Sequence, residues 1–535
     1  MGIASDGDTG AAQPAPEEAG AIAVVGLSCR FPRAAGPEAF WRLLHDGTPP
    51  AGGEPQMAGH PDRGRTGAAA CLDSVNRFEP EFFGIAASEA AAMDPQQRLV
   101  LELAWEALES AGILPEGLAG SETGVFIGAD EDTAPLRPHE AGAARTAPTG
   151  LSRGTLANRV SYVFGLRGPS LVIDTAQSSA LTAVHLACQA LRAGECSEAL
   201  AGGAAAHLIS DADSPVGGAR AAGGVVVLKT LRRALADGDT VHCLIRGGAV
   251  NNDGGGTPAG PLAAAQEDVL RRAYAHAGAD PAAARFVELH GAGTADADLA
   301  EKAALHAVLG CARPARAPLL VSSVRAAVGQ PAGAVGIAAL IKAVLCLREA
   351  VLVAGSPHTE ASPEAPHLRA GDGVRPLVRH GGEPVLAGVS AFGAGGTNCH
   401  VVLSDWRPRR AAPATAAERP SGEEAGRPGP ARRDHGGLPV PWVLSTGIAD
   451  ALRTRPARPH AHPGRHPDDL AHTLAPARDA APYRAVLVGA DRDGFADAAA
   501  ELDDEQVLEI IGELPLQRLR EAGLLSRLLE LAGHR

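Results

Sequence analysis

The sequence predicts an α/β fold in which buried β-sheets are covered by helices on both sides. Short apolar runs at 123–128, 170–174 and 385–390 are bounded by glycine or other small residues, and helical stretches separate them as far as Leu403. Strands that are apolar throughout are typical of sheets buried on both faces, and the intervening helices would provide the cover. Hydrophobic residues make up 45% of the 535-residue chain and aromatic residues only 3%. The core would therefore be built from Ala, Val, Leu and Ile.

The first strand and the first long helix carry the clearest local signals. Residues 21–26 form an apolar run that predicts the opening strand. The stretch 94–112 predicts a helix with Asp94 as its N-cap, Pro95 at the first helical position and Gly112 at its end. Its larger apolar residues recur on neighbouring turns, which predicts one buried face. They are Leu99, Leu103, Trp105 and Leu108.

Changes in composition divide the chain into five parts. Residues 1–19 are acidic and rich in Pro and Ala, which predicts a disordered leader, and residues 20–405 are expected to form the α/β domain. Residues 406–439 consist mainly of Pro, Arg, Ala, Glu and Gly, which is typical of a flexible linker. Residues 440–503 predict a small α/β subdomain, and residues 504–535 predict a helical tail. The tail either packs on its own domain or forms a docking or dimerisation hairpin, and the sequence favours neither.

Charge and hydropathy exclude several classes of function. The net charge is −14 without a stripe of Lys and Arg, whereas a nucleic-acid-binding protein needs the opposite sign. No uninterrupted apolar run is long enough to span a membrane, and the N-terminus lacks the basic-then-apolar order of a secretion signal. The eight cysteines form no CxxC pair and no cluster with His at zinc spacing. We therefore expect a cytoplasmic protein with reduced thiols and with no metal, nucleic-acid or membrane partner.

The sharpest local feature is a turn from a strand into a helix, with glutamine at its centre. The apolar run 170–174 ends at Asp174, and a helix is expected to begin near Ser178. A side chain at such a turn lies at the positive end of a helix dipole, which lowers the pKa of a nucleophile. Gln177 cannot ionise or form an acyl ester, and Ser178 and Ser179 are interpreted as helix N-cap residues. The amide of Gln177 can instead donate hydrogen bonds to a carbonyl or a carboxylate.

Motifs along the chain resemble, in the same order, those of the ketosynthases of modular type I polyketide synthases. DTAQSS at 174–179 resembles their DTACSS active-site motif, with Gln in place of the nucleophilic Cys. AIAVVGLSCRFP, VELHGAGT, SSVRAAVGQ and VSAFGAGGTNCHVVL resemble their opening strand, their VEAHGTGT and SVKSNIGH motifs and their closing segment. The resemblance covers about residues 20–405. It implies a thiolase-like fold with duplicated halves, αβαβα layering and two mixed sheets, followed by the small α/β subdomain and the helical tail.

The resemblance also implies a set of catalytic positions. A condensing ketosynthase uses a thiolate to carry the acyl chain and two histidines that assist decarboxylation and stabilise the enolate. Gln177 stands at the nucleophile position, His290 at the first histidine and Gln330 at the second. Arg325 stands at the family's lysine, and Glu301 at the acidic residue that follows the first histidine motif.

A glycine-rich loop is expected beside the nucleophile position. Phe392, Gly393, Gly395 and Asn398 belong to the segment in which, by resemblance, a backbone amide helps to form the oxyanion hole. Thr294 of the first histidine motif is grouped with them as a substrate-contacting residue. The alternative interpretation of the loop is a tight turn that simply requires glycine.

Three functions are considered for a chain that has Gln177 and Gln330 in place of the family's Cys and second His. The first, condensation, is excluded by the missing thiolate. The second is decarboxylation of malonyl- or methylmalonyl-carrier protein, as in loading-type ketosynthases that also carry Gln for Cys; Gln330 counts against it. The third, which we favour, is a non-condensing role in binding or passing on a carrier-bound chain, or as an inactive partner subunit. The segments 130–150 and 210–220 are shorter than in the family, which also predicts an altered or collapsed pocket.

The expected partners come from the same resemblance. The substrate would be presented on the phosphopantetheine arm of an acyl carrier protein, and no cofactor would be bound by the chain itself. The family also implies a homodimer. The helical tail would provide contacts with other polyketide synthase subunits.

Overall fold

The computed structural model describes two units, residues 1–406 and 407–535, each in part. In the second unit it describes, besides Arg407, only the antiparallel strands β14 (Val440–Thr446) and β15 (Tyr483–Gly489). The predicted leader and tail, and nearly all of the linker, lie outside the described residues, so these parts and the small α/β subdomain stay predictions. No helix in the described part of the chain is long and apolar enough to cross a membrane. The described residues are 20–46, 78–129, 152–208, 219–255, 262–314, 317–329, 332–353, 367–370, 373–379, 383–407, 440–446 and 483–489.

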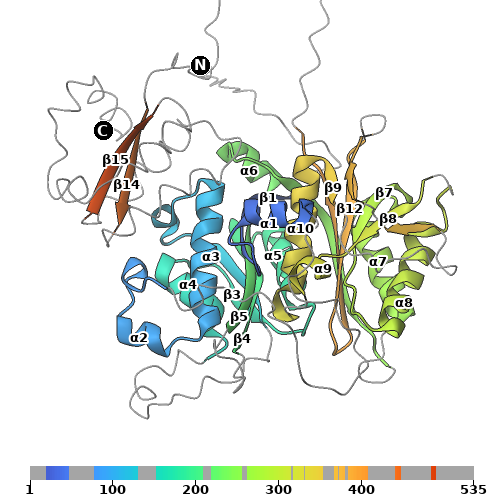
Figure 1. The fold of residues 1–535 in the computed structure, drawn as a ribbon, viewed down its shortest axis with the longest axis horizontal. Coiled ribbons are helices and arrows are strands. Elements are labelled where there is room, and N and C mark those ends of the chain that lie inside the picture. The colour runs from blue at the N-terminus through green and yellow to red at the C-terminus, as the bar shows by residue number, and fades with distance from the viewer. Residues whose placement is uncertain are drawn as a thin grey trace, which may run out of the picture. The chain divides into compact units, whose positions relative to one another are not determined.

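The first unit is built on mixed β-sheet (Figure 1). Hydrogen bonds connect its main strands in the order β10-β8-β7-β12-β13-β6-β1-β5-β4-β2-β3, and β9 pairs with β11 separately. The strands are β1 Ile22–Arg30, β2 Thr123–Gly128, β3 Ser170–Ile173, β4 Glu198–Leu208, β5 Ala219–Thr230, β6 Cys243–Asn252, β7 Ala284–Glu288, β8 Leu319–Ser322, β9 Val351–Val353, β10 Leu368–Ala370, β11 Val374–Pro376, β12 Leu386–Phe392 and β13 Thr397–Ser404.

The helices of this unit lie between the strands along the chain. They are α1 Pro37–His45, α2 Ala87–Ala92, α3 Pro95–Ala111, α4 Thr155–Phe164, α5 Ser179–Ala193, α6 Leu231–Asp237, α7 Ala263–Ala277, α8 Ala295–Leu305, α9 Arg325–Val328 and α10 Val335–Glu349. Short 3-10 helices occur at η2 Glu81–Phe83, η3 Pro115–Leu118, η5 Pro281–Ala283 and η7 Ala332–Ala334, and a π-helix, η6, covers His306–Gly310.

The two halves of the unit repeat one pairing pattern. In the first half, β1, β5, β4, β2 and β3 are neighbours, joined by two antiparallel and then two parallel pairings. In the second half, β6, β13, β12, β7 and β8 repeat the same order and the same directions. The strands of the first half are called the first sheet and those of the second half the second sheet. The two sheets join where β1 pairs with β6 over only three residue pairs. This is the duplicated thiolase-like arrangement that the family resemblance implies.

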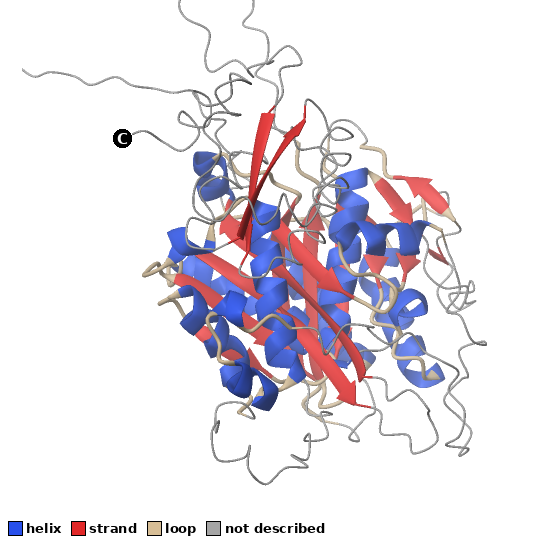
Figure 2. Ribbon diagram, turned by 60° about the vertical axis from the view of Figure 1, so that its left-hand side comes forward, coloured by secondary structure: helices blue, strands red, loops and turns tan. Residues whose placement is uncertain are grey.

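Helices form the three remaining layers (Figures 1 and 2). Helices α3 and α4 cover the outer face of the first sheet, and α7 and α8 cover the outer face of the second. Helices α5 and α10 contact each other and lie between the sheets, where α10 is buried from Val335 to Leu347. The large central core joins these two helices to both sheets, so the order of layers is αβαβα.

The local sequence signals are confirmed by α3 and by β1. Asp94 Oδ1 accepts a hydrogen bond from Gln96 N at 2.8 Å, and Gly112 ends the helix with φ 73°. Glycine adopts this left-handed conformation without a steric cost. The opening strand is longer than the apolar run 21–26 predicted, because β1 continues along β5 as far as Arg30. Of the predicted short loop 210–220, the last two residues instead begin β5, and residues 210–218 lie outside the described residues.

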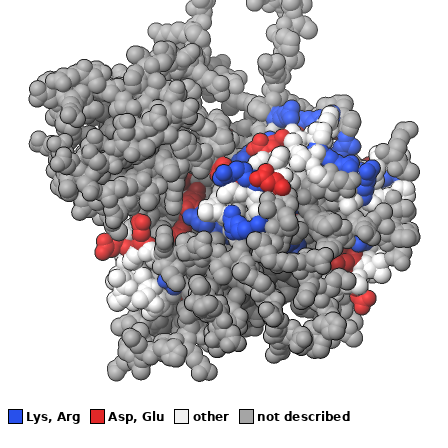
Figure 3. Space-filling view, in the orientation of Figure 1, with Lys and Arg blue, Asp and Glu red and all other residues white. Residues whose placement is uncertain are grey.

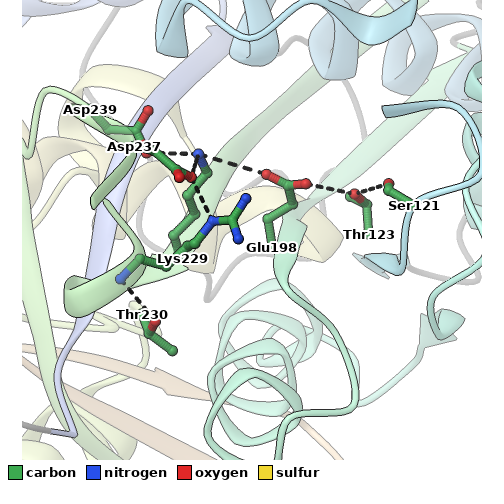
Figure 4. Close-up of polar contacts among 8 residues, drawn as sticks. Ser121, Thr123, Glu198, Lys229, Thr230, Asp237 and Asp239 are labelled. Carbon is green, nitrogen blue, oxygen red and sulfur yellow. Dashed lines mark hydrogen bonds and ion pairs between the residues drawn. The ribbon is translucent and has the colours of Figure 1, made fainter. Parts of the chain in front are cut away.

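A network of ionised side chains closes one end of the first sheet (Figure 4). Lys229 Nζ at the end of β5 lies 2.7 Å from Asp239 Oδ2, 2.8 Å from Asp237 Oδ2 and 3.7 Å from Glu198 Oε2. Glu198 accepts a hydrogen bond from Thr123 Oγ1 at 3.1 Å. The network ties β2, β4, β5 and α6 together at the start of β2. On the face of the molecule in Figure 3, the described acidic and basic side chains are interspersed.

Candidate active site

Gln177 lies between β3 and α5, at the strand-to-helix turn that the sequence predicts. Ala176 has φ 54°, an uncommon left-handed conformation for a residue with a Cβ, and its N–H donates to Asp174 Oδ1 at 3.2 Å. Ser178 is the N-cap residue of α5 by position, but its hydroxyl donates to Thr175 O at 2.8 Å and makes no capping bond. The hydroxyl of Ser179 accepts from Thr175 N at 2.8 Å. The expectation that these serines cap the helix through their hydroxyls is therefore wrong. Both hydroxyls form hydrogen bonds with the backbone of Thr175 in the turn.

The glycine-rich loop 392–398 packs directly on this turn. Ala394 N donates to the side-chain Oε1 of Gln177 at 2.9 Å, although the two residues are 217 positions apart in the sequence. Gly393 makes the close approach possible, because a Cβ at this position would lie only 2.1 Å from Thr175 O. The loop is thus more than a turn that needs glycine, since one of its backbone amides binds the side chain of Gln177, whose role as the residue at the nucleophile position stays a prediction.

The loop also makes polar contacts with β6 and with Asp253, which follows β6. Asn398 is buried, and its Nδ2 donates to Asp253 Oδ1 at 2.8 Å and to Asn251 Oδ1 at 3.2 Å. Gly395 is exposed, and its carbonyl accepts from Asn252 Nδ2 at 3.1 Å. In this geometry the Asn398 amide fixes the loop, while its predicted contact with substrate stays a prediction.

His290 is linked to the loop through Phe392. The two rings are 5.8 Å apart between centroids and 64° apart in plane, which is an edge-to-face contact. His290 is 6% exposed, and burial together with the positive charge of Arg325 lowers its pKa to about 4. The imidazole is therefore neutral at physiological pH and offers one N–H donor.

Glu301 and Arg325 hold the backbone around His290. The carboxylate of Glu301, in α8, accepts from His290 N at 2.8 Å and from Gly291 N at 2.9 Å. Burial raises the pKa of this carboxyl from 4.5 to about 7, although both hydrogen bonds act in the opposite direction. Arg325 Nη1 donates to Gly291 O at 2.7 Å, and its guanidinium lies across Gly293, where a Cβ would come within 1.7 Å of it.

The remaining two predicted site residues, Thr294 and Gln330, have no described side-chain contact with the others. Thr294 is exposed immediately before α8, and its carbonyl accepts from Asp298 N at 2.9 Å. Gln330 lies outside the described residues, so its place beside His290 stays a prediction. The structure thus brings Gln177 together with the loop, and His290 together with Phe392, Glu301 and Arg325.

A fully buried ion pair beneath this site was not predicted. Lys342 Nζ in α10 lies 3.0 Å from Glu288 Oε2 and donates to Ser322 Oγ at 3.2 Å, and all three residues have no exposed surface. Glu288 ends β7 two residues before His290, and Ser322 ends β8 three residues before Arg325. A lysine in the middle of the apolar run VGIAALIKAVLCL was the available signal, because a buried ammonium requires a buried acidic partner.

Comparisons with known proteins identify the family. Models of the β-ketoacyl synthase N-terminal and C-terminal domains match residues 19–213 and 242–358. The chain is similar to polyketide synthase GfsA of Streptomyces halstedii, with 45% identity over 521 residues that cover 88% of this chain and 7% of that protein. It is 38% identical over 539 residues to erythronolide synthase EryA2 of Saccharopolyspora erythraea, which covers 91% of this chain and 14% of that protein. The chain therefore spans only a small part of the length of these relatives.

Solved structures agree with this comparison. The oxazolomycin ketosynthase domain OzmH KS7 of Streptomyces albus JA3453 aligns with a TM-score of 0.72 and 30% identity, over 89% of this chain and 87% of that domain. Domain OzmH KS8 of the same organism has 34% identity and a TM-score of 0.56, over 76% of this chain and all of that domain. Fold, motifs and relatives lead to one conclusion: the chain belongs to the ketosynthase family of modular type I polyketide synthases.

Proposed function

We propose that this chain is a non-condensing ketosynthase-like domain that holds a carrier-bound acyl thioester without forming a covalent acyl-enzyme. Gln177, at the position of the family's nucleophile, has no ionisable group that could carry the chain. The nearest cysteine in the sequence is Cys188, which is buried inside α5, where burial raises its pKa to about 12. Such a thiol stays protonated and cannot replace the missing thiolate.

The hydrogen bond from Ala394 N to Gln177 Oε1, 2.9 Å long, is the observation that carries this proposal. A backbone N–H can only donate, so the Gln177 atom that faces it is the amide oxygen and the NH2 group faces elsewhere. The amide that would help to form an oxyanion hole is thus already engaged by Gln177 itself. Gln177 NH2 and neutral His290 remain as uncharged donors for a thioester carbonyl.

Decarboxylation of a malonyl or methylmalonyl thioester is the second candidate, and the same pair of donors favours it. In this reaction the bond between Cα and the carboxylate breaks, CO2 leaves, and the electron pair becomes an enolate that is then protonated at Cα. The enolate oxygen needs hydrogen-bond donors and no covalent catalyst. Gln330 at the second histidine position weighs against high activity, because one lost donor of this kind costs on the order of 3 kcal/mol in the transition state.

The remaining parts of the proposal concern the partners. The substrate arrives on the phosphopantetheine arm of an acyl carrier protein, and the chain itself binds no cofactor. The chain forms a homodimer. Its C-terminal helical tail contacts other polyketide synthase subunits, or the chain serves as the inactive partner of an active ketosynthase.

The test is to incubate the pure protein with malonyl- and methylmalonyl-carrier protein. The mass of the protein and the mass of the carrier protein are both followed by intact mass spectrometry. Binding of the carrier with no change in either mass is the expected result. Gln177→Cys should gain a covalent acyl group, because the turn and its loop remain. Gln189→Ala, an exposed glutamine on the same helix, is the matched control. Acylation of the wild-type protein would refute the proposal, and loss of CO2 that disappears in Gln177→Ala would establish the decarboxylase instead.

A further inference from the structure

A cysteine and a histidine meet at the far end of α8, away from the site described above. The 11-residue helix α8 begins after Thr294 and passes directly into the π-helix His306–Gly310. At 1.5 Å per residue, the 11 residues of α8 separate Thr294 from the π-helix by about 16 Å. Cys311 follows the π-helix, and its Sγ lies 3.7 Å from His306 Nε2.

The π-helix is what brings these two side chains together. Cys311 N donates to His306 O at 2.8 Å, which is the five-residue bond of a π-turn. In an α-helix, residues five apart lie on different faces, because each residue turns the chain by about 100°. The wider π-turn returns Cys311 to the side of His306. Single π-turns of this kind are frequent at functional sites.

The His306 ring is held in place by its surroundings. It stacks on His367, with centroids 5.5 Å apart and the planes 5° apart. His367 comes directly before β10, and its carbonyl accepts from Leu319 N at 2.8 Å, which ties it to β8. Gly310 leaves room for the ring, because a Cβ there would lie 2.8 Å from His306 Nδ1. The imidazole therefore faces Cys311 from a fixed position.

Cys311 differs from the other described cysteines in its exposure. It is exposed, whereas the other six described cysteines are buried. Burial raises the pKa of Cys188 to about 12 and the pKa of Cys196 and Cys346 to about 11, which keeps these thiols protonated and inert. Only Cys311, among the described residues, therefore combines access for a reagent with a base beside the sulfur.

We propose that Cys311 is a modification site that reacts with small disulfides, with His306 as its proton acceptor. His306 Nε2 takes the thiol proton, and Sγ attacks one sulfur of the incoming disulfide. The new bond between Sγ and that sulfur forms as the disulfide bond breaks, and the leaving thiolate takes the proton from His306. The disulfide is the only oxidant required. No group of three or more His, Cys, Asp or Glu in the described part of the chain could hold a metal ion.

The experiment uses the full chain with Cys71→Ser, so that the remaining thiols are the seven described ones. Oxidised glutathione is added under native conditions, and adducts are followed by intact mass and located by peptide mapping. We expect a single adduct at Cys311, none in Cys311→Ser, and a rate at least about tenfold lower in His306→Asn. His45→Asn, an exposed histidine on α1, should react at the unchanged rate.

The six buried thiols report whether each variant is folded, because an unfolded chain would take up several adducts. If His306→Asn fails this criterion, His306→Gln replaces it in the same comparison. An adduct on another thiol, no adduct at all, or equal rates with and without His306 would each overturn the proposal.

Discussion

Replacing Glu301 with glutamine tests how the backbone around His290 is held. The carboxyl is buried, and its pKa in the folded protein is raised from 4.5 to about 7. Above pH 4.5 the unfolded chain releases this proton while the folded chain keeps it. The free energy of unfolding therefore falls as the pH rises towards 7 and is level above that. One pKa unit corresponds to about 1.4 kcal/mol, so the loss amounts to about 3 kcal/mol.

Glu301→Gln removes this pH dependence, because an amide does not titrate. The variant also loses one of the two backbone hydrogen bonds, because its NH2 group faces a backbone N–H. This loss lowers the free energy of unfolding by about 1–3 kcal/mol at every pH. We expect the stability of the wild type relative to the variant to fall by about 3 kcal/mol between about pH 5 and pH 8.

Urea-unfolding midpoints across this pH range, multiplied by the m-value, give the required free energies. Glu116→Gln, which removes an exposed carboxylate on η3, is the control for the general effect of charge. If the curves of the wild type and Glu301→Gln run parallel, the folded protein keeps this carboxylate ionised throughout and the argument from burial fails.

Three further predictions concern the loop, the buried ion pair and the histidine. Gly393→Ala places a Cβ 2.1 Å from Thr175 O and should lower stability in urea by about 1–3 kcal/mol, whereas Gly395→Ala, with nothing within 4 Å, should not. Lys342→Met leaves the buried Glu288 without its cation and should cost about 3–5 kcal/mol in the same assay, with partial recovery when Glu288→Gln is added. The His290 ring should titrate at about 4 in isotope-edited NMR, because burial and Arg325 disfavour its cation.

Each of these predictions has a clear contrary result. Equal costs for the two glycine variants would mean that the loop does not press on the turn. A double variant no more stable than Lys342→Met would mean that the uncompensated charge is not the cause of the loss. A His290 resonance that titrates near its ordinary pKa would mean that the imidazole is open to water.

The sequence predicted the parts of this structure that depend on neighbouring residues. The bounds of α3 follow from Asp94, Pro95 and Gly112, which act within one turn of the helix. The turn at Gln177 follows from an apolar strand that runs into small residues. Family motifs then indicated which distant segments belong together, and the contacts of Gln177 with the loop and of His290 with Phe392 agree with that grouping.

The features that the sequence did not predict depend on contacts between distant segments, which no local pattern encodes. The bond between Ala394 and Gln177 requires two segments to approach to within a hydrogen bond, and the sequence alone does not give that distance. The ion pair of Lys342 and Glu288 joins α10 to β7 in the same way. The hydroxyls of Ser178 and Ser179 point into the turn and not along the helix, because the left-handed Ala176 places other partners within their reach.

The long separation between Gln177 and its partner has a consequence for synthesis of the protein. Ribosomes add about 5–20 residues per second, so the 217 residues between Gln177 and Ala394 take roughly 10 to 40 s to emerge. During this interval the turn at Gln177 can already have its helix, but the loop that contacts Gln177 is not yet complete. The contact between Gln177 and the loop therefore forms only when nearly all of the first unit has left the ribosome, and a chain arrested earlier lacks it.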